Sequence, residues 1–213
     1  MSTRLLHPVR VFAVAALLAS GLFAQTPPAK IDFPSASPAG VLKQRVGVTD
    51  IEVNYNRPSA RGRAIFGGLV PYGAIWRTGA DTATKLTLST AAKLNGKEVP
   101  AGTYELFTIP GRDEWTIVIG QNKGQWGSYA YDPKNDVARF TAKPVALAEP
   151  VESLQFAIND LRPASATLTI AWEKTLVPVK IEVDPASTLV PQIEAVMASN
   201  AETKPYFAAA MFY

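Results

Sequence analysis

The chain has 213 residues, with 21 basic and 18 acidic side chains, one histidine and no cysteine. The absence of cysteine excludes disulfides and thiol nucleophiles. The histidine is His7, near the N-terminus, so the rest of the chain also has no residue for a Cys/His zinc site, haem attachment or a histidine base. The small net charge and the lack of any Lys/Arg run argue against nucleic-acid binding. We therefore expect no metal site, no cofactor and no nucleic acid as a partner.

The N-terminus, residues 1–24, has the pattern of a secretory signal peptide. Arg4 and Arg10 give it a positive start, and an apolar run follows from Val11 to Phe23. This run is shorter than the roughly 20 residues of a stable membrane span, although a retained anchor is the alternative. Cleavage is expected after Ala24, which would lower the formal net charge from +3 to +1. We expect a periplasmic or secreted protein with no stable membrane span.

Residues 25–40 hold four prolines among small residues, which is typical of a flexible, extended leader. From residue 41 to 184, short segments of alternating apolar and polar residues are separated by Gly, Pro, Asn and Asp, which predicts strands. The expected strands are Val41–Val46, Ile51–Tyr55, Ala83–Thr90, Thr103–Ile109, Trp115–Gly120, Val137–Ala142, Val151–Ile158, Ala166–Glu173 and Val177–Val183. Asn95-Gly96 within Lys93–Val99 predicts a tight hairpin.

Short strands with hairpin-length links and no intervening helices predict antiparallel sheets packed face to face. We expect an all-β protein over residues 41–184, an antiparallel β-sandwich of jelly-roll type with about ten strands. A partly open barrel is the alternative fold. Leu168, Ile170 and Trp172 alternate with polar residues and are expected to face the core.

The last residues, 185–213, predict a short helical tail. Pro185 ends the strand pattern, and apolar residues then recur at helical spacing. Thr203 is expected to cap a second helix, with Pro205 in its first turn. This second segment is strongly apolar, so we expect it to dock on the sandwich rather than remain uncovered. A chain that has been shortened within the tail is the alternative.

Four segments carry a long and distinctive pattern: Tyr55–Gly73, Trp76–Ala80, Pro100–Tyr104 and Gly124–Gly127. They resemble the bacterial domain of unknown function 2911 family, over roughly residues 37–184. The resemblance implies an exported envelope protein, in some members with paired helices after the β domain. It implies no established activity and no catalytic residues.

The connection between residues 57 and 81 is long for a compact domain and is rich in arginine, which is typical of a functional or tightly ordered loop. Its candidate ligand-binding residues are Arg57, Arg61, Arg63, Trp76, Arg77 and Asp81. Arginine offers bidentate donors to anions, and tryptophan offers an apolar face to sugar rings. We predict a cleft for a polar or anionic ligand. The structural alternative is an Arg77–Asp81 ion pair with Trp76 in the core.

Residues 121–136 form a second loop that is both polar and aromatic. Trp126, Tyr129 and Tyr131 are expected to line a binding surface beside the first loop. The acidic and amide side chains near residue 132 lack the spacing of a calcium loop, so Asx turns are expected there.

Together these features favour a non-enzymatic, exported cell-envelope protein that binds a glycan or an envelope protein through the two loops. The alternative is a glycan hydrolase or lyase that works without histidine, through carboxylates or through a tyrosine beside Arg or Lys. The candidate carboxylates are Asp81, Glu105, Asp113, Glu114 and Asp132. No catalytic spacing motif accompanies them, and a purely structural role is the remaining alternative.

Overall fold

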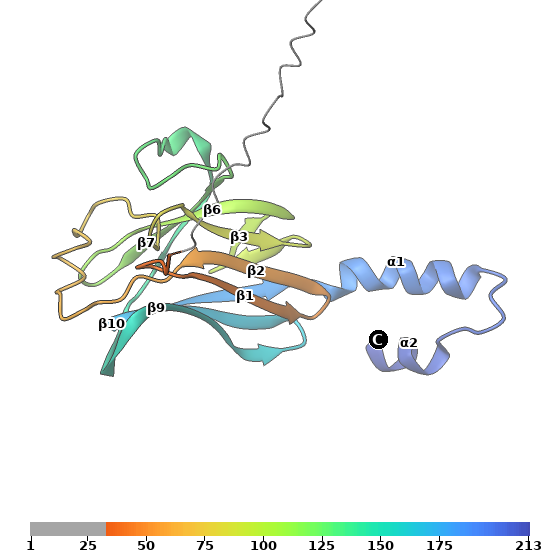
Figure 1. Cartoon of the computed structure of the whole chain (residues 1–213). Helices are drawn as coiled ribbons and strands as arrows, with labels where there is room; N and C mark the ends of the chain where they lie inside the picture. Colours follow the sequence, from red (N-terminus) through yellow and green to blue (C-terminus); the bar gives the residue numbers. More distant parts are fainter. Residues whose placement is uncertain (1–32) are drawn as a thin grey trace, which may run out of the picture. The chain divides into compact units, whose positions relative to one another are not determined.

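The structure is a computed structural model that describes residues 33–213. The expected signal peptide and the first half of the expected leader lie outside the described residues. The described part contains ten strands in two antiparallel sheets, followed by two helices (Figure 1). This arrangement confirms the predicted antiparallel β-sandwich, and the barrel alternative is wrong.

The first sheet has six strands in the order β1-β2-β3-β6-β7-β8, and every neighbouring pair is antiparallel. The strands are β1 (Ala39–Val46), β2 (Thr49–Asn56), β3 (Thr84–Leu88), β6 (Gly102–Ile109), β7 (Trp115–Gln121) and β8 (Asp136–Ala142). Alternation of buried and half-buried residues in β2 and β3 places every second side chain between the sheets.

The second sheet has four strands in the order β5-β4-β10-β9. The strands are β4 (Ala92–Leu94), β5 (Lys97–Val99), β9 (Val145–Arg162) and β10 (Ser165–Val183). The predicted hairpin joins β4 to β5, where Asn95 and Gly96 have φ angles of 45° and 78°. Positive φ at both central residues is the requirement of a type I′ turn, so the hairpin prediction is confirmed.

Strand β10 runs unbroken where the sequence predicted two strands, Ala166–Glu173 and Val177–Val183. Its pairing with β9 shifts register on both sides of Glu173, which has a φ of 53°. Such a bulge bends a strand and redirects its side chains without ending it. The polar residues around Lys174 interrupt the alternation in the sequence, although the backbone continues as a strand.

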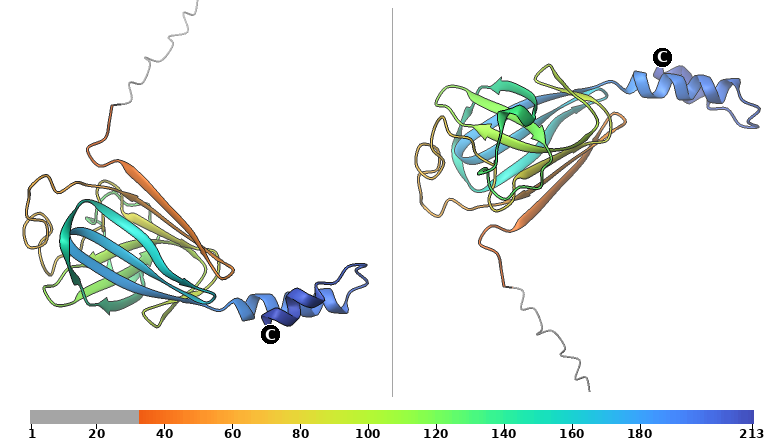
Figure 2. Two further views of the ribbon diagram at one scale, coloured as in Figure 1. Left: turned by 90° about the horizontal axis from the view of Figure 1, so that it is seen from below. Right: turned by 90° about the horizontal axis from the view of Figure 1, so that it is seen from above.

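The hydrophobic core lies between the two sheets and draws on both of them. Leu168, Ile170 and Trp172 are each at most 2% exposed, as the alternation predicted. Full burial of such a side chain stabilises the fold by about 1.5–3 kcal/mol. Figures 1 and 2 show the sheets as facing layers, with the loop between β2 and β3 at the end away from the β1–β2 turn.

The tail forms helix α1 (Pro185–Ala198) and helix α2 (Tyr206–Phe212). The Asp184 side chain caps α1 by accepting a hydrogen bond from the Ser187 N–H at 3.2 Å. The Thr203 cap prediction is wrong, because the residue before α2 is Pro205 and it makes no side-chain cap bond. Helix α1 has no buried residue and α2 has one, so the burial that docking on the sandwich would bring is not observed. Neither helix of the described chain is long and apolar enough to traverse a bilayer.

Candidate functional site

The loop of residues 57–83 is hydrogen-bonded to both sheets. Near its start, the Ala60 N–H donates to the Glu152 carbonyl of β9 at 2.7 Å. Near its end, Trp76 and Thr108 of β6 exchange two backbone hydrogen bonds of 2.8 and 2.9 Å. The loop therefore crosses from the edge of the second sheet to the first, with its backbone fixed at both ends.

The two loops singled out by the sequence lie against each other, as predicted. The Gly127 N–H donates to the Asp81 carbonyl at 2.9 Å, and the Ala83 N–H donates to the Gln125 carbonyl at 3.3 Å. These bonds form a short antiparallel bridge between the loops. Residues more than 40 positions apart in the sequence thus belong to one surface.

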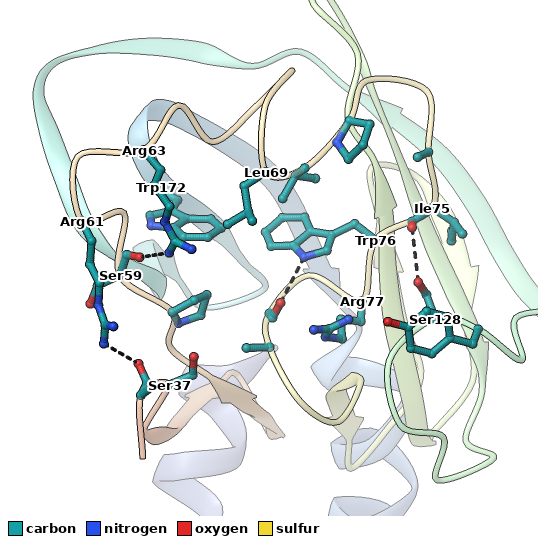
Figure 3. A pocket seen from close by; sticks show the side chains of 18 residues that line it. Ser37, Ser59, Arg61, Arg63, Leu69, Ile75, Trp76, Arg77, Ser128 and Trp172 are labelled. Atoms are coloured by element: carbon teal, nitrogen blue, oxygen red, sulfur yellow. Dashed lines mark hydrogen bonds between the residues drawn. The ribbon is translucent and has the colours of Figure 1, made fainter. Parts of the chain in front are cut away.

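A cavity of about 390 Å³ opens beside this bridge (Figure 3). Its walls come from the first loop, from the middle of the second, from the residues before β1 and from β10. The lining consists of Ala36, Ser37, Pro58, Ser59, Arg61, Arg63, Leu69, Val70, Pro71, Ala74, Ile75, Trp76, Arg77, Gly79, Ala80, Ser128, Tyr129 and Trp172. The expected leader therefore contributes two residues to the site at its C-terminal end.

The inner wall of the cavity is aromatic. The indole rings of Trp76 and Trp172 have centroids 5.8 Å apart and planes 20° apart, and Phe66 packs edge-on against both. Trp76 is 8% exposed and its Nε1–H donates to the Gly79 carbonyl at 3.0 Å. The structural reading of Trp76 as a core residue is thus correct, and one edge of the same ring still lines the cavity.

Three guanidinium groups line the cavity, those of Arg61, Arg63 and Arg77. In Figure 3, Arg61 and Arg63 lie on one side with Ser59, and Arg77 lies on the other side beside Ser128. No Asp or Glu is among the lining residues, and none of the ion pairs within residues 33–213 includes these three arginines. The cavity lining therefore carries positive charge and no carboxylate of its own; the Glu152 carboxylate, outside the lining, accepts a hydrogen bond from the Arg61 backbone N–H at 2.8 Å.

Arg77 differs from the other two arginines in its hydrogen bonding. Arg63 donates from Nε and Nη2 to backbone carbonyls at 2.9 and 2.7 Å, and Arg61 donates from Nη2 to the Ala36 carbonyl at 3.3 Å. The Arg77 Nε is buried and has no hydrogen-bond partner among the described residues. The Arg77–Asp81 ion pair of the structural alternative is not among the ion pairs of residues 33–213. A buried, unpaired charged donor is costly, so it marks a group suited to an external acceptor.

Backbone strain is concentrated next to Arg77. Thr78 has a φ of 53° and is fully buried, which is a rare conformation for a β-branched residue. Its hydroxyl donates to the Thr108 Oγ1 at 3.1 Å, and its carbonyl accepts the Thr84 hydroxyl at 2.8 Å. These contacts hold the strained turn and with it the direction of the Arg77 side chain. Strain held by surrounding contacts is frequent at ligand sites.

The second loop carries two stacked aromatic rings, of which one lines the cavity. Trp126 and Tyr129 stack with centroids 5.9 Å apart and planes 18° apart, yet they are 59% and 82% exposed. Tyr129 lines the cavity and Trp126 lies just outside it. The Arg77 Cζ is 5.7 Å from the centroid of the Trp126 ring, in cation–π range.

Four of the predicted binding residues lie outside the lining: Arg57, Asp81, Trp126 and Tyr131. The Arg57 Nε–H donates to the Leu154 carbonyl at 3.0 Å, so this donor is already occupied within the protein. The Tyr131 hydroxyl donates to the Asp136 carboxylate at 3.0 Å and accepts from Arg139 at 2.6 Å. Burial of the ring raises the pKa of Tyr131, and the hydrogen bond to Asp136 adds to the rise. Tyr131 is therefore a packing residue of the second loop.

A buried carboxylate fixes the second loop and is not part of the cavity. Glu105 of β6 is fully buried; its Oε1 accepts from the Lys123 and Gln125 N–H groups at 3.3 and 3.0 Å, and its Oε2 accepts from the Gln125 side chain at 2.6 Å. The sequence pattern indicates Glu105 only as a candidate acid or base. A charged residue among the apolar side chains of β6 was the signal for this structural role.

The other candidate carboxylates, Asp81, Asp113, Glu114 and Asp132, also lie outside the cavity lining. Within residues 33–213, no cluster of His, Asp or Glu side chains has the arrangement of a metal site. The chemistry that the cavity offers is therefore cationic hydrogen bonding from arginine, hydroxyl hydrogen bonding from serine, and apolar contact with aromatic rings.

Comparison with known proteins places the domain in one family. No curated protein and no solved structure matches the chain. The family model described as "Protein of unknown function (DUF2911)" matches residues 37–181, which includes both loops and every strand up to most of β10. The chain is therefore a member of the DUF2911 family.

Proposed function

We propose that the cavity between the two loops binds a small anionic ligand without transforming it. The observation that carries this proposal is the set of three guanidinium groups, Arg61, Arg63 and Arg77, around a cavity whose lining has no carboxylate. Arginine forms planar, bidentate hydrogen bonds that match carboxylate geometry. The unpaired Arg77 Nε is the donor with the most to gain from such a ligand.

The size and walls of the cavity favour a sugar acid. Its volume of about 390 Å³ is near the low end of small-molecule sites, which span roughly 300–1,000 Å³. Leu69, which is 49% exposed, provides an apolar surface for the C–H face of a ring and is backed by the buried rings of Trp76 and Trp172, and Ser59 and Ser128 provide hydroxyl partners. One sugar ring with a carboxylate matches this mixture of apolar and cationic groups.

The proposed place of action is outside the cytoplasm. The support for export is the N-terminal pattern of positive charge, a short apolar run and a small-residue cleavage site. An exported protein with this cavity would meet sugar acids of cell-envelope or extracellular polysaccharides. We therefore propose a periplasmic or secreted binding protein for acidic glycan units.

Binding is favoured over catalysis because of what lines the cavity. Glycoside hydrolysis requires two carboxyl groups within about 10 Å of each other across the substrate, and the lining contains none. A lyase would instead need Tyr129 to act beside Arg77. Incubation of the protein with polygalacturonate, with release of unsaturated ends as the readout, tests that alternative; accumulation of such ends would contradict the binding proposal.

The direct test is calorimetric titration with galacturonate, with galactose as the neutral control. The two sugars differ at C6, where galacturonate carries the carboxylate. We expect galacturonate to bind and galactose to bind at least tenfold more weakly. Arg77→Ala should weaken galacturonate binding by about tenfold or more, as expected for loss of a hydrogen bond to a charged group worth about 1.5–3 kcal/mol.

Arg112→Ala is the matched control for Arg77→Ala. The Arg112 Cζ lies 4.9 Å from the centroid of the Tyr72 ring, so it also pairs with an aromatic ring, but Arg112 does not line the cavity. Its replacement should leave galacturonate affinity unchanged. Equal affinity for galactose and galacturonate, or equal losses in the two variants, would refute the proposal.

A further inference from the structure

The stacked rings of Trp126 and Tyr129, here called the aromatic platform, form an exposed surface at the edge of the cavity. The rings are 59% and 82% exposed, whereas the other three tryptophans of the chain, Trp76, Trp115 and Trp172, are at most 8% exposed. The cavity by itself does not account for the platform, because Trp126 is not among its lining residues. An exposed aromatic pair beside a binding cavity suggests a further contact surface.

The aromatic platform is held in place by its surroundings. Glu105 fixes the backbone immediately before Trp126 through the Lys123 and Gln125 N–H groups. Gly127 immediately after it has a φ of 74°, and a Cβ at that position would lie 2.8 Å from the Tyr129 ring. The loop therefore requires glycine at residue 127 to let the Tyr129 ring lie where it does. A surface fixed in this way loses little conformational entropy when a ligand binds.

Arg77 joins the aromatic platform to the cavity. It lines the cavity, and its Cζ also lies 5.7 Å from the centroid of the Trp126 ring. Positive charge is therefore present at the boundary between the two surfaces. A ligand that extends from the cavity onto the platform would pass this guanidinium and would be favoured if it carried a negative charge there.

We propose that the aromatic platform is a second subsite, and that the ligand is an acidic oligosaccharide with one ring in the cavity and the adjoining ring on Tyr129 and Trp126. This inference rests on the proposed binding of a sugar acid in the cavity. The flat, apolar faces of the two rings suit the C–H face of a pyranose, and Arg77 suits a carboxylate carried by either ring. A chain of uronic acid residues repeats both features at each unit.

The position of Trp126 gives this proposal its own readout. Because it is the one exposed tryptophan of the four, acrylamide should quench mainly its fluorescence. A trimer of galacturonate should protect Trp126 from acrylamide, whereas monomeric galacturonate should leave it accessible. Trp126→Phe keeps an aromatic ring and removes the quenchable signal, so it identifies the fluorescence that is being measured.

Affinity provides the second measurement. The trimer should bind about five- to tenfold more tightly than the monomer, as expected when a second ring adds a stacking contact worth about 1–1.4 kcal/mol. Trp126→Ala should reduce the affinity for the trimer to about that for the monomer. Tyr206→Ala is the control, because Tyr206 is an equally exposed aromatic residue, 63% exposed, in helix α2. Its replacement should leave the preference for the trimer intact.

The outcomes separate the two proposals. Binding of monomer and trimer with equal affinity, and no protection of Trp126 by the trimer, would overturn the second subsite and leave the cavity proposal standing. Absence of binding by either ligand would overturn both. Equal protection by an oligonucleotide of similar length would also overturn the inference, because the platform would then be selecting any stacked ring rather than an acidic sugar chain.

Discussion

The indole rings of Trp76 and Trp172 stack with centroids 5.8 Å apart, although one comes from the loop between β2 and β3 and the other from β10. Trp172 follows the core residue Ile170 in the alternation of β10 and precedes the bulge at Glu173. The stack therefore connects the wall of the cavity directly to the hydrophobic core. Stability and ligand binding are expected to depend on the same contact.

Replacement of Trp172 by alanine should lower the free energy of unfolding by about 3–5 kcal/mol, because it leaves a large cavity in a fully buried position. Urea denaturation followed by circular dichroism measures this change. Trp172→Phe should lower the free energy of unfolding by a smaller amount, since part of the ring contact with Trp76 remains. Trp126→Ala removes a 59% exposed ring and should change the unfolding free energy by far less. Equal losses in Trp172→Ala and Trp126→Ala would contradict the assignment of the core.

Glu105→Ala should destabilise the second loop, because it leaves the Lys123 and Gln125 N–H groups without their acceptor. Each unsatisfied buried donor costs about 1–3 kcal/mol. Hydrogen exchange at these two amides should accelerate, and acrylamide quenching of Trp126 should increase. Glu98→Ala is the control, since the Glu98 side chain is 84% exposed and takes part only in a loose ion pair of 3.8 Å with Lys93. Unchanged exchange in Glu105→Ala would show that the carboxylate does not hold the loop.

Asp81→Gly should leave the free energy of unfolding unchanged or raise it by up to about 1 kcal/mol. Residue 81 has a positive φ, which glycine adopts without strain. The φ of Asp81 is 56°, and the loop contact it makes to Gly127 uses its backbone carbonyl. Asp81→Ala keeps the strained backbone and should show no such gain. Thermal melting compares the two variants. A marked loss of stability in Asp81→Gly would instead support the ion pair with Arg77 that the sequence suggested.

Alkaline pH should destabilise the fold through its buried tyrosines. Burial raises the pKa of Tyr104 and of Tyr131 in the folded state. Both phenols are neutral below the unfolded-state pKa of about 10, and stability is lost as the pH rises from there through the higher folded-state values. Denaturation midpoints measured between neutral and strongly alkaline pH should therefore fall, and Tyr131→Phe should make the fall shallower. An unchanged slope in Tyr131→Phe would argue that Tyr131 ionises as easily when folded as when unfolded.

Export should remove the N-terminal segment. Expression of the full chain in a bacterium should yield a periplasmic or secreted protein whose mass matches a start at Gln25, after cleavage at Ala24. Intact mass spectrometry of the periplasmic fraction is the measurement. A variant with Arg4 and Arg10 changed to glutamate should accumulate uncleaved, because the positive start of the signal is lost. Retention of the full-length wild-type chain in the membrane would favour the anchor alternative.

Much of the fold follows from local pattern in the sequence. Alternation in the segments that form β2 and β3, and Asn95-Gly96 between β4 and β5, predicted strands and turn because each is governed by neighbours in the chain. The continuous path of β10 through Glu173 was missed, since a bulge and a turn both interrupt the alternation. Pairing with β9 distinguishes the two, and that pairing is a long-range property.

The site was predicted only in part for the same reason. Arg77 and Tyr129 were identified from residue type and loop context, and the structure places both in the cavity lining. Tyr131 was chosen on identical grounds, yet it packs on Phe107 with ring centroids 5.3 Å apart. Ser37 and Trp172 complete the cavity lining from segments far away in sequence. Their local sequence pattern does not predict that they line a cavity. Which aromatic residues of a loop face solvent is decided by tertiary packing.

The attachment of the first loop to both sheets has a mechanical consequence. Arg61 and Arg63 follow the stretch bonded to β9, whereas Arg77 follows the residue bonded to β6. A ligand bound by all three arginines would link the two layers of the sandwich non-covalently and reversibly. The chain has no cysteine, so no disulfide links the layers. Pulling the layers apart in a force spectrometer should therefore require more force when the cavity is filled than when it is empty.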